Sequence, residues 1–398
     1  MIKYAILGYG TVGKGVAEVM AEQRDKIASV VGDELELGYI LVRHDYPGDP
    51  YADKMVTDFA VIENDPEIAI VAEVIGGAGD AYDYTKRALR AGKSVVTSNK
   101  ELVAMHGAEL NRIARKKGVN YLFEGSVGGG IPLLRPLTQC LAANRIDEIF
   151  GILNGTTNYI LTAMDVQGQS FDAALKTAQE LGYAEADPTA DVEGIDACRK
   201  TAILADLAFG YNMDPTKIPT RGITAVTSAD QELASALGYS IKLLGRAVRA
   251  PGGCCAFVEP HLVPASHLLA SVSGVMNACV IRGNAVGEVM FYGPGAGRRP
   301  TASAVAADIV DAAQHREHRK DTDLGAPGGV LAPADGLVSR WYVRSPDDPA
   351  HIRKYFPEAE PVYGSSQECG FLTEPADRRS LKKKLTAVKA AAAYRVLE

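Results

Sequence analysis

Two lysines in this sequence stand where a lysine could do acid–base chemistry or bind a charged substrate. Lys200 follows an acidic segment, residues 185–196, that contains five carboxylates, and Asp196 lies four residues before it, so the two share one helical face. A lysine beside carboxylates can anchor a charged substrate or, when it is desolvated, transfer protons. The carboxylates in turn suit an ammonium group. The alternative is a solvated helix start, because Asp and Glu are favoured in a first helical turn.

The second lysine, Lys100, follows directly on a short apolar segment, residues 94–97, that is typical of a buried strand. In an open parallel sheet, ligands bind outside the carboxyl ends of the strands. This position therefore predicts that Lys100 lies near a bound cofactor. The alternative for Lys100 is a surface lysine at the start of a helix.

Gly8, Gly10 and Gly13 form the pattern G-x-G-x-x-G between an apolar run at 2–7 and a helical pattern at 14–27. The first glycine allows a tight turn, the second lets the backbone approach a pyrophosphate, and the third lets helix and strand pack closely. The N–H groups at the start of the helix can bind the phosphate. The pattern predicts a dinucleotide site, and the alternative is a glycine-rich turn without a ligand.

The end of the second predicted strand, residues 37–42, bears on the choice of cofactor. NAD-binding proteins usually place Asp or Glu there, to bind the ribose 2′-hydroxyl. This sequence has Arg43, which can pair with a 2′-phosphate, and Asp45 follows two residues later. NADP is therefore the favoured cofactor, and NAD is the alternative. The alternative for Arg43 itself is a solvated charge at the end of a strand, with no role in cofactor binding.

Strands and helices alternate over the first part of the chain, which predicts a parallel α/β sheet. After it, the glycine-rich segment 125–132 reads as a flexible joint. The strands are expected at 2–7, 37–42, 69–75, 94–97 and 119–123, and the helices between them include 14–27, 82–91 and 102–117.

These patterns divide the chain of 398 residues into unequal units. Residues 1–125 are expected to form the NAD(P)-binding domain and residues 126–318 an α+β domain, whose helix at 302–314 returns to the first domain. A charged and then Gly/Pro-rich stretch, 319–338, reads as a linker, and residues 339–398 form a final unit.

Composition excludes several classes of protein. Lys and Arg total 42 and Asp and Glu total 49, so the net charge is 42 − 49 = −7, which argues against nucleic acid as a partner. The sequence has no run of about 18 apolar residues and no signal peptide at its start, so no membrane partner is expected. The six cysteines show no C-x-x-C spacing, which suits a reduced, cytoplasmic protein without a structural zinc site.

Six segments in their order along the chain carry a resemblance to a known family: Gly8–Gly13, Ser98–Glu101, Phe123–Pro132, Gly151–Asn158, Leu181–Pro188 and Gly293–Gly297. They span about residues 1–315 and resemble homoserine dehydrogenase. The resemblance implies a Rossmann domain plus a substrate-binding and dimerisation domain, in a homodimer or homotetramer. It implies the NAD(P)-dependent interconversion of L-homoserine and L-aspartate 4-semialdehyde, on the pathway to threonine, methionine and isoleucine.

The resemblance also implies roles for individual residues. Lys200 would donate the proton to the carbonyl during reduction, and Lys100 is the other acid–base candidate. A monovalent cation, usually sodium, would be bound at the joint by Glu124, Val127, Gly129 and Ile131, mostly through backbone carbonyls. The substrate would contact Gly155, Thr156, Tyr183, Glu185, Asp191, Asp196 and Lys200. The cofactor would contact Gly8, Gly10, Thr11, Val12, Gly13, Arg43, Gly76, Ser98, Lys100 and Gly297.

The sequence departs from the family in two places. Many relatives carry a C-terminal ACT domain, a βαββαβ regulatory unit, but the middle of residues 339–398 leaves little room for two full strands and a helix. We therefore expect a reduced ACT-like tail used for oligomer contacts, a hypothesis that strong inhibition by threonine would contradict. Many relatives also place a lysine soon after the arginine at the NADP site, whereas the next lysine here is Lys54.

Two other functions are alternatives to this one. A non-catalytic nicotinamide-binding sensor on the same fold would be expected to lose Lys200 or the acidic segment, and both are present. Another two-domain oxidoreductase acting on an amino acid or aldehyde would explain the glycine turn. It would not explain Asn154–Asn158 and the acidic segment together.

Overall fold

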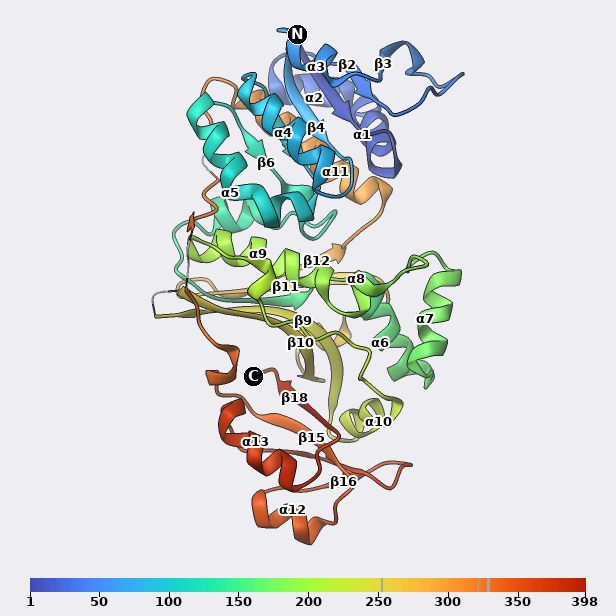
Figure 1. Ribbon diagram of the computed structural model, residues 1–398, viewed down its shortest axis with the longest axis vertical. Coiled ribbons are helices and arrows are strands. Elements are labelled where there is room, and N and C mark those ends of the chain that lie inside the picture. The colour runs from blue at the N-terminus through green and yellow to red at the C-terminus, as the bar shows by residue number, and fades with distance from the viewer. Residues whose placement is uncertain (252, 321, 328–329) are drawn as a thin grey trace.

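The computed structural model describes residues 1–251, 253–320, 322–327 and 330–398. Of the segments predicted above, residue 252 of the second domain and residues 321 and 328–329 of the linker lie outside the described residues. The described residues form two principal sheets, one in each half of the molecule, and Figure 1 shows them one above the other.

The first sheet is parallel, with the strand order β3-β2-β1-β4-β5-β6, which is the order of a doubly wound dinucleotide-binding fold. The fold-class prediction of a Rossmann domain is confirmed. Its strands are β1 (Ile2–Leu7), β2 (Leu35–Leu41), β3 (Met55–Val56), β4 (Ile68–Glu73), β5 (Ser94–Thr97) and β6 (Tyr121–Leu122). Its helices are α1 (Thr11–Glu22), α2 (Arg24–Val31), α3 (Phe59–Asn64), α4 (Gly79–Arg90) and α5 (Lys100–Lys117).

Both faces of this sheet are covered, which explains why its strands read as short apolar runs. Helices α3, α4 and α5 pack on one face. The other face is covered by α1 together with α11 (Arg298–Gln314), a helix from much later in the chain that lies beside α1 in Figure 1. Val305 and Ile309 of α11 are fully buried against Val16 and Met20 of α1. The chain therefore returns to the first domain after the second one is complete.

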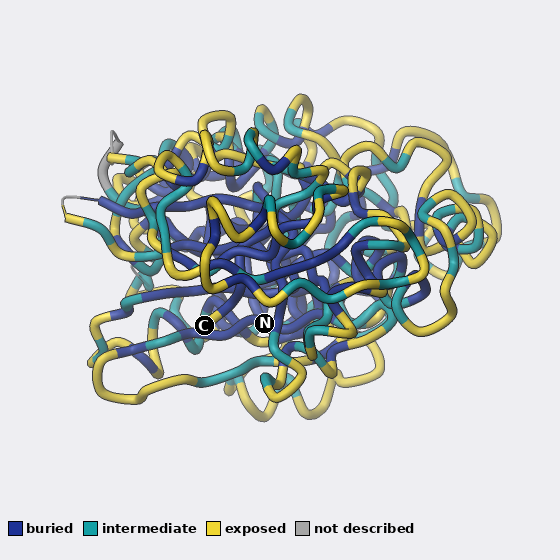
Figure 2. The backbone as a smooth tube through the Cα atoms, turned by 90° about the horizontal axis from the view of Figure 1, so that it is seen from below, coloured by how far each residue is buried: buried dark blue, intermediate teal, exposed yellow. Residues whose placement is uncertain are grey.

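The second sheet is mixed and has ten strands among the described residues. Its first part consists of β7 (Ile146–Ile152), β9 (Tyr239–Ala250), β10 (Gly253–Pro264), β11 (Met276–Gly283) and β12 (Gly287–Pro294). Figure 1 shows α9 between this sheet and the first domain. The helices of this half are α6 (Gly155–Gln167), α7 (Phe171–Glu180), α8 (Thr189–Val192), α9 (Ile195–Phe209) and α10 (Ser228–Ala236). Figure 2 shows the buried backbone gathered in the interior, with exposed loops around it.

The C-terminal unit contains the complete order β–α–β–β–α–β, although the sequence predicts little room in its middle for two full strands and a helix. The middle elements fit because they are short: a helix of seven residues and strands of two and four. The Asp348 carboxylate caps the helix by accepting two backbone N–H groups. The elements are β15 (Trp341–Ser345), α12 (Pro349–Tyr355), β16 (Val362–Tyr363), β17 (Cys369–Leu372), α13 (Arg378–Ala387) and β18 (Ala392–Val396).

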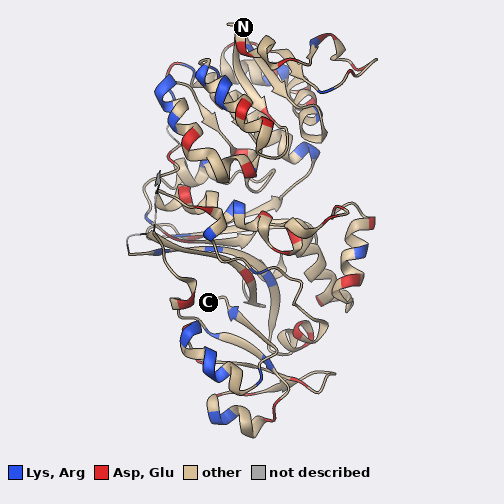
Figure 3. Ribbon diagram, in the orientation of Figure 1, with Lys and Arg blue, Asp and Glu red and all other residues tan. Residues whose placement is uncertain are grey.

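This unit continues the second sheet, because β18 pairs in parallel with β10 at His261–Arg395 and Leu262–Val396. Two buried ion pairs reinforce the junction: Arg344 Nε lies 2.8 Å from Asp230 Oδ1, and Arg395 Nε lies 2.7 Å from Glu259 Oε1. Lys382–Lys384 of α13 are exposed, which agrees with a solvated helix face (Figure 3).

The described part of the predicted linker lies along both halves of the molecule. Leu324 is buried, and the Asn111 side chain of α5 donates a hydrogen bond to the Thr322 carbonyl. The two short strands of this segment, β13 (Ala326–Pro327) and β14 (Val330–Leu331), pair with β8 (Tyr211–Asn212) and with β10. No helix among the described residues combines the length and the apolar character needed to cross a bilayer.

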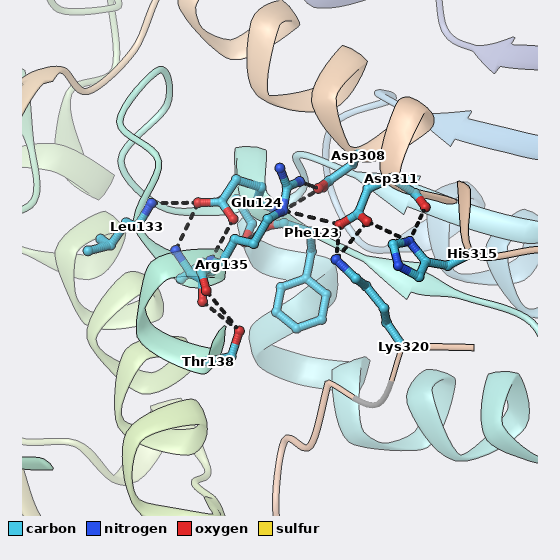
Figure 4. A network of polar contacts seen from close by, with 11 residues as sticks. Phe123, Glu124, Leu133, Arg135, Thr138, Asp308, Asp311, His315 and Lys320 are labelled. Atoms are coloured by element: carbon cyan, nitrogen blue, oxygen red, sulfur yellow. Dashed lines mark hydrogen bonds and ion pairs between the residues drawn. The ribbon is translucent and has the colours of Figure 1, made fainter. Parts of the chain in front are cut away.

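A network of charged groups connects the joint after β6 to α11 (Figure 4). Arg135 donates to Asp308 at 2.5 Å and lies 3.2 Å from Asp311, and the backbone N–H of Glu124 donates to Asp308 at 2.8 Å. Lys320 adds a second cation, 2.7 Å from Asp311. The side chain of Asp308 is only 2 % exposed, so this network is a buried connection between the two domains.

Candidate active site

Lys200 and Lys100 meet at the junction of the two domains, on opposite sides of one carboxylate. Lys200 and Asp196 lie one turn apart on α9, and their Nζ and Oδ2 atoms are 2.8 Å apart. Lys100 is the first residue of α5, directly after β5, and its Nζ lies 2.5 Å from Asp196 Oδ1. The structure therefore brings together two lysines that are a hundred residues apart, and Asp196 bridges them.

Two further groups of the second domain hold this cluster in place. Lys200 Nζ also donates to the carbonyl of Leu153, at 2.7 Å. The amide of Asn154 donates to Asp196 at 2.9 Å and to Asp191 at 2.7 Å. Sequence reasoning did not single out Asn154 for the site. Its position as the N-cap of α6, where its carbonyl oxygen accepts from the N–H of Thr157, is the signal that could have found it.

Burial and charge perturb the titration of these groups. Burial lowers the pKa of Lys200 below its ordinary value, and the neighbouring Asp196 carboxylate opposes that shift. Burial alone would raise the pKa of Asp196, but the Lys200 and Lys100 ammonium groups hold it well below its usual range. Burial raises the pKa of Asp191. A lysine with a depressed pKa beside a permanently ionised carboxylate is a suitable proton donor and acceptor.

The remaining predicted substrate residues lie on α6 and on the segment that follows α7. Gly155 begins α6, and a Cβ there would lie 2.6 Å from the Val275 carbonyl, so only glycine fits. The Thr156 hydroxyl donates to the Tyr183 carbonyl at 2.7 Å. The side chains of Tyr183 and Glu185 are exposed, and among the described residues neither contacts the lysine cluster.

The glycine turn opens onto a groove of about 620 Å³ at the carboxyl ends of β1, β2 and β4. Gly8 has φ of +95°, which favours glycine, and a Cβ at Gly13 would lie 2.0 Å from the Gly8 carbonyl. A Cβ at Gly10 would meet no protein atom within 4 Å, so the backbone there is open to a ligand. Of the predicted cofactor residues, Gly8, Gly10, Arg43 and Gly76 line the groove, and Thr11 and Val12 begin the adjoining helix.

The groove is lined by Arg43, His44 and Tyr46 but not by Asp45. The guanidinium of Arg43 is exposed and lies 3.3 Å from Asp80 Oδ2. Along this loop Arg43, and not Asp45, thus lines the groove, and the Asp80 carboxylate that pairs with Arg43 also lines it.

The predicted contacts Ser98, Lys100 and Gly297 lie outside the lining of this groove. Ser98 follows β5, and Gly297, with φ of +122°, is the residue before α11. Sequence reasoning missed Glu73, which is fully buried at the end of β4. Its carboxyl accepts from the Ile75 N–H at 2.7 Å and from the Thr97 hydroxyl at 2.6 Å, so it orders both turns beside Lys100.

The predicted cation ligands lie in one buried loop. The Glu124 carboxylate accepts three backbone N–H groups, from residues 133, 134 and 135, and its main-chain carbonyl accepts the Val127 N–H at 3.5 Å. Val127, Gly129 and Ile131 are buried, and their carbonyls accept none of the loop hydrogen bonds found among the described residues. No group of three or more His, Cys, Asp or Glu side chains suited to a metal is found in the described part of the chain.

Comparison with known proteins agrees with this geometry. A family model described as homoserine dehydrogenase matches residues 132–310, and one described as the homoserine dehydrogenase NAD-binding domain matches residues 8–124. The chain is 39% identical over 362 residues to homoserine dehydrogenase of Lactococcus lactis, covering 88% of this chain and 84% of that protein. It is 47% identical over 311 residues to homoserine dehydrogenase of Pseudomonas aeruginosa, covering 78% of this chain and 72% of that protein.

Solved structures give the same result. A homoserine dehydrogenase from Thiobacillus denitrificans superposes with a TM-score of 0.91 at 37% identity, covering 100% of this chain and 98% of that one. A hyperthermophilic archaeal homoserine dehydrogenase mutant in complex with NADPH superposes with a TM-score of 0.67 at 30% identity, covering 78% and 97%. On its sequence, its two domains and its cofactor groove, the chain belongs to the homoserine dehydrogenase family.

Proposed function

We propose that this protein interconverts L-homoserine and L-aspartate 4-semialdehyde with a nicotinamide cofactor. The observation that carries the proposal is the buried cluster of Lys200, Asp196 and Lys100 between the cofactor domain and the second domain. In the oxidative direction the alcohol carbon loses a hydride and its hydroxyl loses a proton; reduction reverses both. A bound nicotinamide supplies the hydride acceptor or donor at its C4 atom.

Lys200 is proposed to manage the proton. Its ammonium would donate to the carbonyl oxygen during reduction, and the neutral amine would take the hydroxyl proton during oxidation. While protonated, it also stabilises negative charge that develops on that oxygen. Lys100 is more exposed than Lys200 and belongs to the cofactor domain, so we propose that it orients substrate and cofactor and shares the acid–base role.

The amino group of the substrate is proposed to lie on the carboxylate side of the cluster. Asp191 and Asp196 both accept from the Asn154 amide, which sets them side by side. Glu185 supplies a further carboxylate from the exposed loop before α8. Gly155, Thr156 and Tyr183 would complete the pocket.

NADP is the proposed cofactor, with NAD as the alternative. The open backbone at Gly10 and the start of α1 fit a pyrophosphate, and Arg43 at the far end of the groove fits a 2′-phosphate. Gly8, Thr11, Val12 and Gly13 would surround the phosphates. Gly76, Ser98, Lys100 and Gly297 would contact the nicotinamide side.

A monovalent cation, sodium by preference, is proposed to bind in the loop after β6. The buried carbonyls of Val127, Gly129 and Ile131 fit a hard cation with oxygen ligands, together with the Glu124 carbonyl. Because this loop lies against Gly295, where a Cβ at Gly129 would be 2.5 Å from the carbonyl, the cation would brace the segment that leads into α11. We expect choline in place of sodium to lower thermal stability and activity together, and unchanged melting in choline would contradict the site.

Further proposals concern the domain division, the assembly and the location of the protein. We propose a division into residues 1–125, 126–318, 319–338 and 339–398, with the last as a short ACT-like unit, and an assembly of two or four copies in the cytoplasm. The pairing of β10 with β18 makes the C-terminal unit part of the second sheet, which supports a structural role for this unit.

One spectrophotometric experiment tests the function. Homoserine oxidation is followed at 340 nm with NADP and with NAD in separate arms, and each arm is repeated with added threonine. We expect turnover with both cofactors, a lower KM for NADP, and no inhibition by threonine. Absence of turnover in both arms would contradict the proposed function, and strong threonine inhibition would contradict the structural role of the tail. A sensor would bind the cofactor without turnover.

Replacing Asp196 by asparagine is expected to move the pH profile of kcat for homoserine oxidation toward lower pH, by about one unit or more. The Asp196 carboxylate raises the pKa of Lys200, so its loss lowers that pKa further and makes the neutral amine available at lower pH. The alkaline limb for aldehyde reduction should shift in the same direction. The control is Asp172→Asn on an exposed turn of α7, and an unshifted profile in the Asp196 variant would contradict the pairing.

A further inference from the structure

Lys14 of α1 lies beside the cofactor groove, although the sequence motif assigns it no role. It directly follows Gly13, in the first turn of the helix, and side chains on a helix tilt toward its N-terminus. Its Nζ lies 5.4 Å from the ring centroid of Tyr9 and 5.3 Å from that of Tyr46. Both of these rings line the groove. The Lys14 ammonium is therefore held on two aromatic faces at the edge of the dinucleotide site.

The two rings are fixed in place by their own contacts. The Tyr9 hydroxyl donates to Asp49 Oδ1 at 2.9 Å, and Tyr9 meets Tyr46 edge-on with a centroid distance of 5.4 Å. Tyr46 in turn stacks on His44 at 4.8 Å. The loop after β2, which carries Arg43, is thus bound to the start of α1 through Tyr9 and Tyr46, and Lys14 lies at that contact.

The charge of Lys14 is not neutralised within the described part of the chain. It forms no ion pair there, and the carboxylate one turn further along α1, Glu18, pairs with Arg298. The nearby Asp49 is engaged by Tyr9 and by the N–H of Tyr51. A half-buried ammonium without a carboxylate partner, beside a groove shaped for a phosphorylated ligand, indicates an anion at this point.

We propose that Lys14 is the second cation for the 2′-phosphate of NADP and acts together with Arg43. Arg43 approaches from the loop after β2 and Lys14 from the start of α1, so the two charges enclose the same end of the groove. Lys14 would then supply the charge that a lysine soon after the arginine would otherwise provide. This inference rests on the proposed nicotinamide-dependent function, and it adds a specificity-determining residue to it.

The test is the affinity of the full-length apo-protein for NADPH and for NADH, measured by isothermal titration calorimetry. In Lys14→Met, which keeps the aliphatic stem on the tyrosine rings, we expect NADPH to bind about tenfold more weakly or worse, which is the size of one charge-assisted contact. NADH should bind within about twofold of the wild type. Lys14→Arg should retain most of the NADPH affinity, and Lys26→Met, at an exposed lysine of α2, is the control.

An equal loss for NADPH and NADH would place Lys14 on the pyrophosphate, which both cofactors share, and would overturn the proposal. Unchanged NADPH affinity in Lys14→Met would overturn it as well. Adenosine 2′,5′-bisphosphate and ADP, titrated in the same way, should repeat the NADPH and NADH results without the nicotinamide. These experiments measure cofactor binding alone. The proposed function is tested separately, by the homoserine turnover assay described above, so failure of one proposal is distinguished from failure of the other.

Discussion

Replacing Lys200 by methionine is expected to lower kcat for homoserine oxidation by about 10²–10⁴-fold, the usual contribution of a positioned acid–base group. The cofactor should still bind within about twofold of the wild type, because the groove at Gly8 and Gly10 is formed by the other domain. Lys200 is buried, and hydrogen bonds to Asp196 and to the Leu153 carbonyl fix the position of its ammonium. Stopped-flow and steady-state rates at 340 nm would measure the loss.

The fold should tolerate this change, because Asp196 keeps two partners. Lys100 remains 2.5 Å from one of its oxygens, and the Asn154 amide remains 2.9 Å from the other. Lys176→Met, at an exposed lysine of α7, is the matched control and should retain full activity. Near-wild-type turnover in the Lys200 variant would sink the proposed role, and the Lys100→Met variant, measured in parallel, would then be the next acid–base candidate.

Much of the first domain could be predicted because its strands are buried on both faces. The predicted strands at 2–7 and 94–97 agree with β1 and β5 to the residue. The helix predicted at 14–27 is in fact two helices that meet at Gln23, since the apolar period continues across the break and hides it. The pairing of β18 with β10 could not be predicted, because local patterns contain no information about a partner more than a hundred residues away.

Contacts in the candidate active site could be predicted where they depend on the spacing of residues along one helix. They could not be predicted where they depend on how the two domains pack together. The four-residue spacing of Asp196 and Lys200 is enough to predict their contact. The ion pair between Lys100 and Asp196 joins α5 to α9, and only the packing of the two domains creates it. Glu124 is a residue whose side-chain interaction the sequence does not reveal. A carboxylate suits a cation, yet this carboxylate accepts backbone N–H groups of the turn that begins at Leu133.

Replacing Arg135 by methionine is expected to destabilise the protein by about 3–5 kcal/mol at pH 8, the typical effect of removing one partner of a buried ion pair. Among the described residues, Asp308 would keep only the Glu124 N–H as a close partner, whereas Asp311 would keep Lys320 and His315. Urea unfolding followed by circular dichroism measures the change. The loss should be reduced in the double variant Arg135→Met/Asp308→Asn, which leaves no uncompensated charge.

The loss of stability caused by Arg135→Met should also depend on pH and should be larger at pH 8 than at pH 5. Burial raises the pKa of Asp308 to about 7, against the opposing effect of Arg135, and loss of the guanidinium would raise it further. A carboxyl with a raised pKa keeps its proton in the folded state longer than in the unfolded state, so stability falls as pH increases. At pH 5 Asp308 is protonated with or without Arg135, and the variant should be closer to the wild type than at pH 8. An equal loss at both values would show that Arg135 acts through packing between the domains and not through the charge of Asp308.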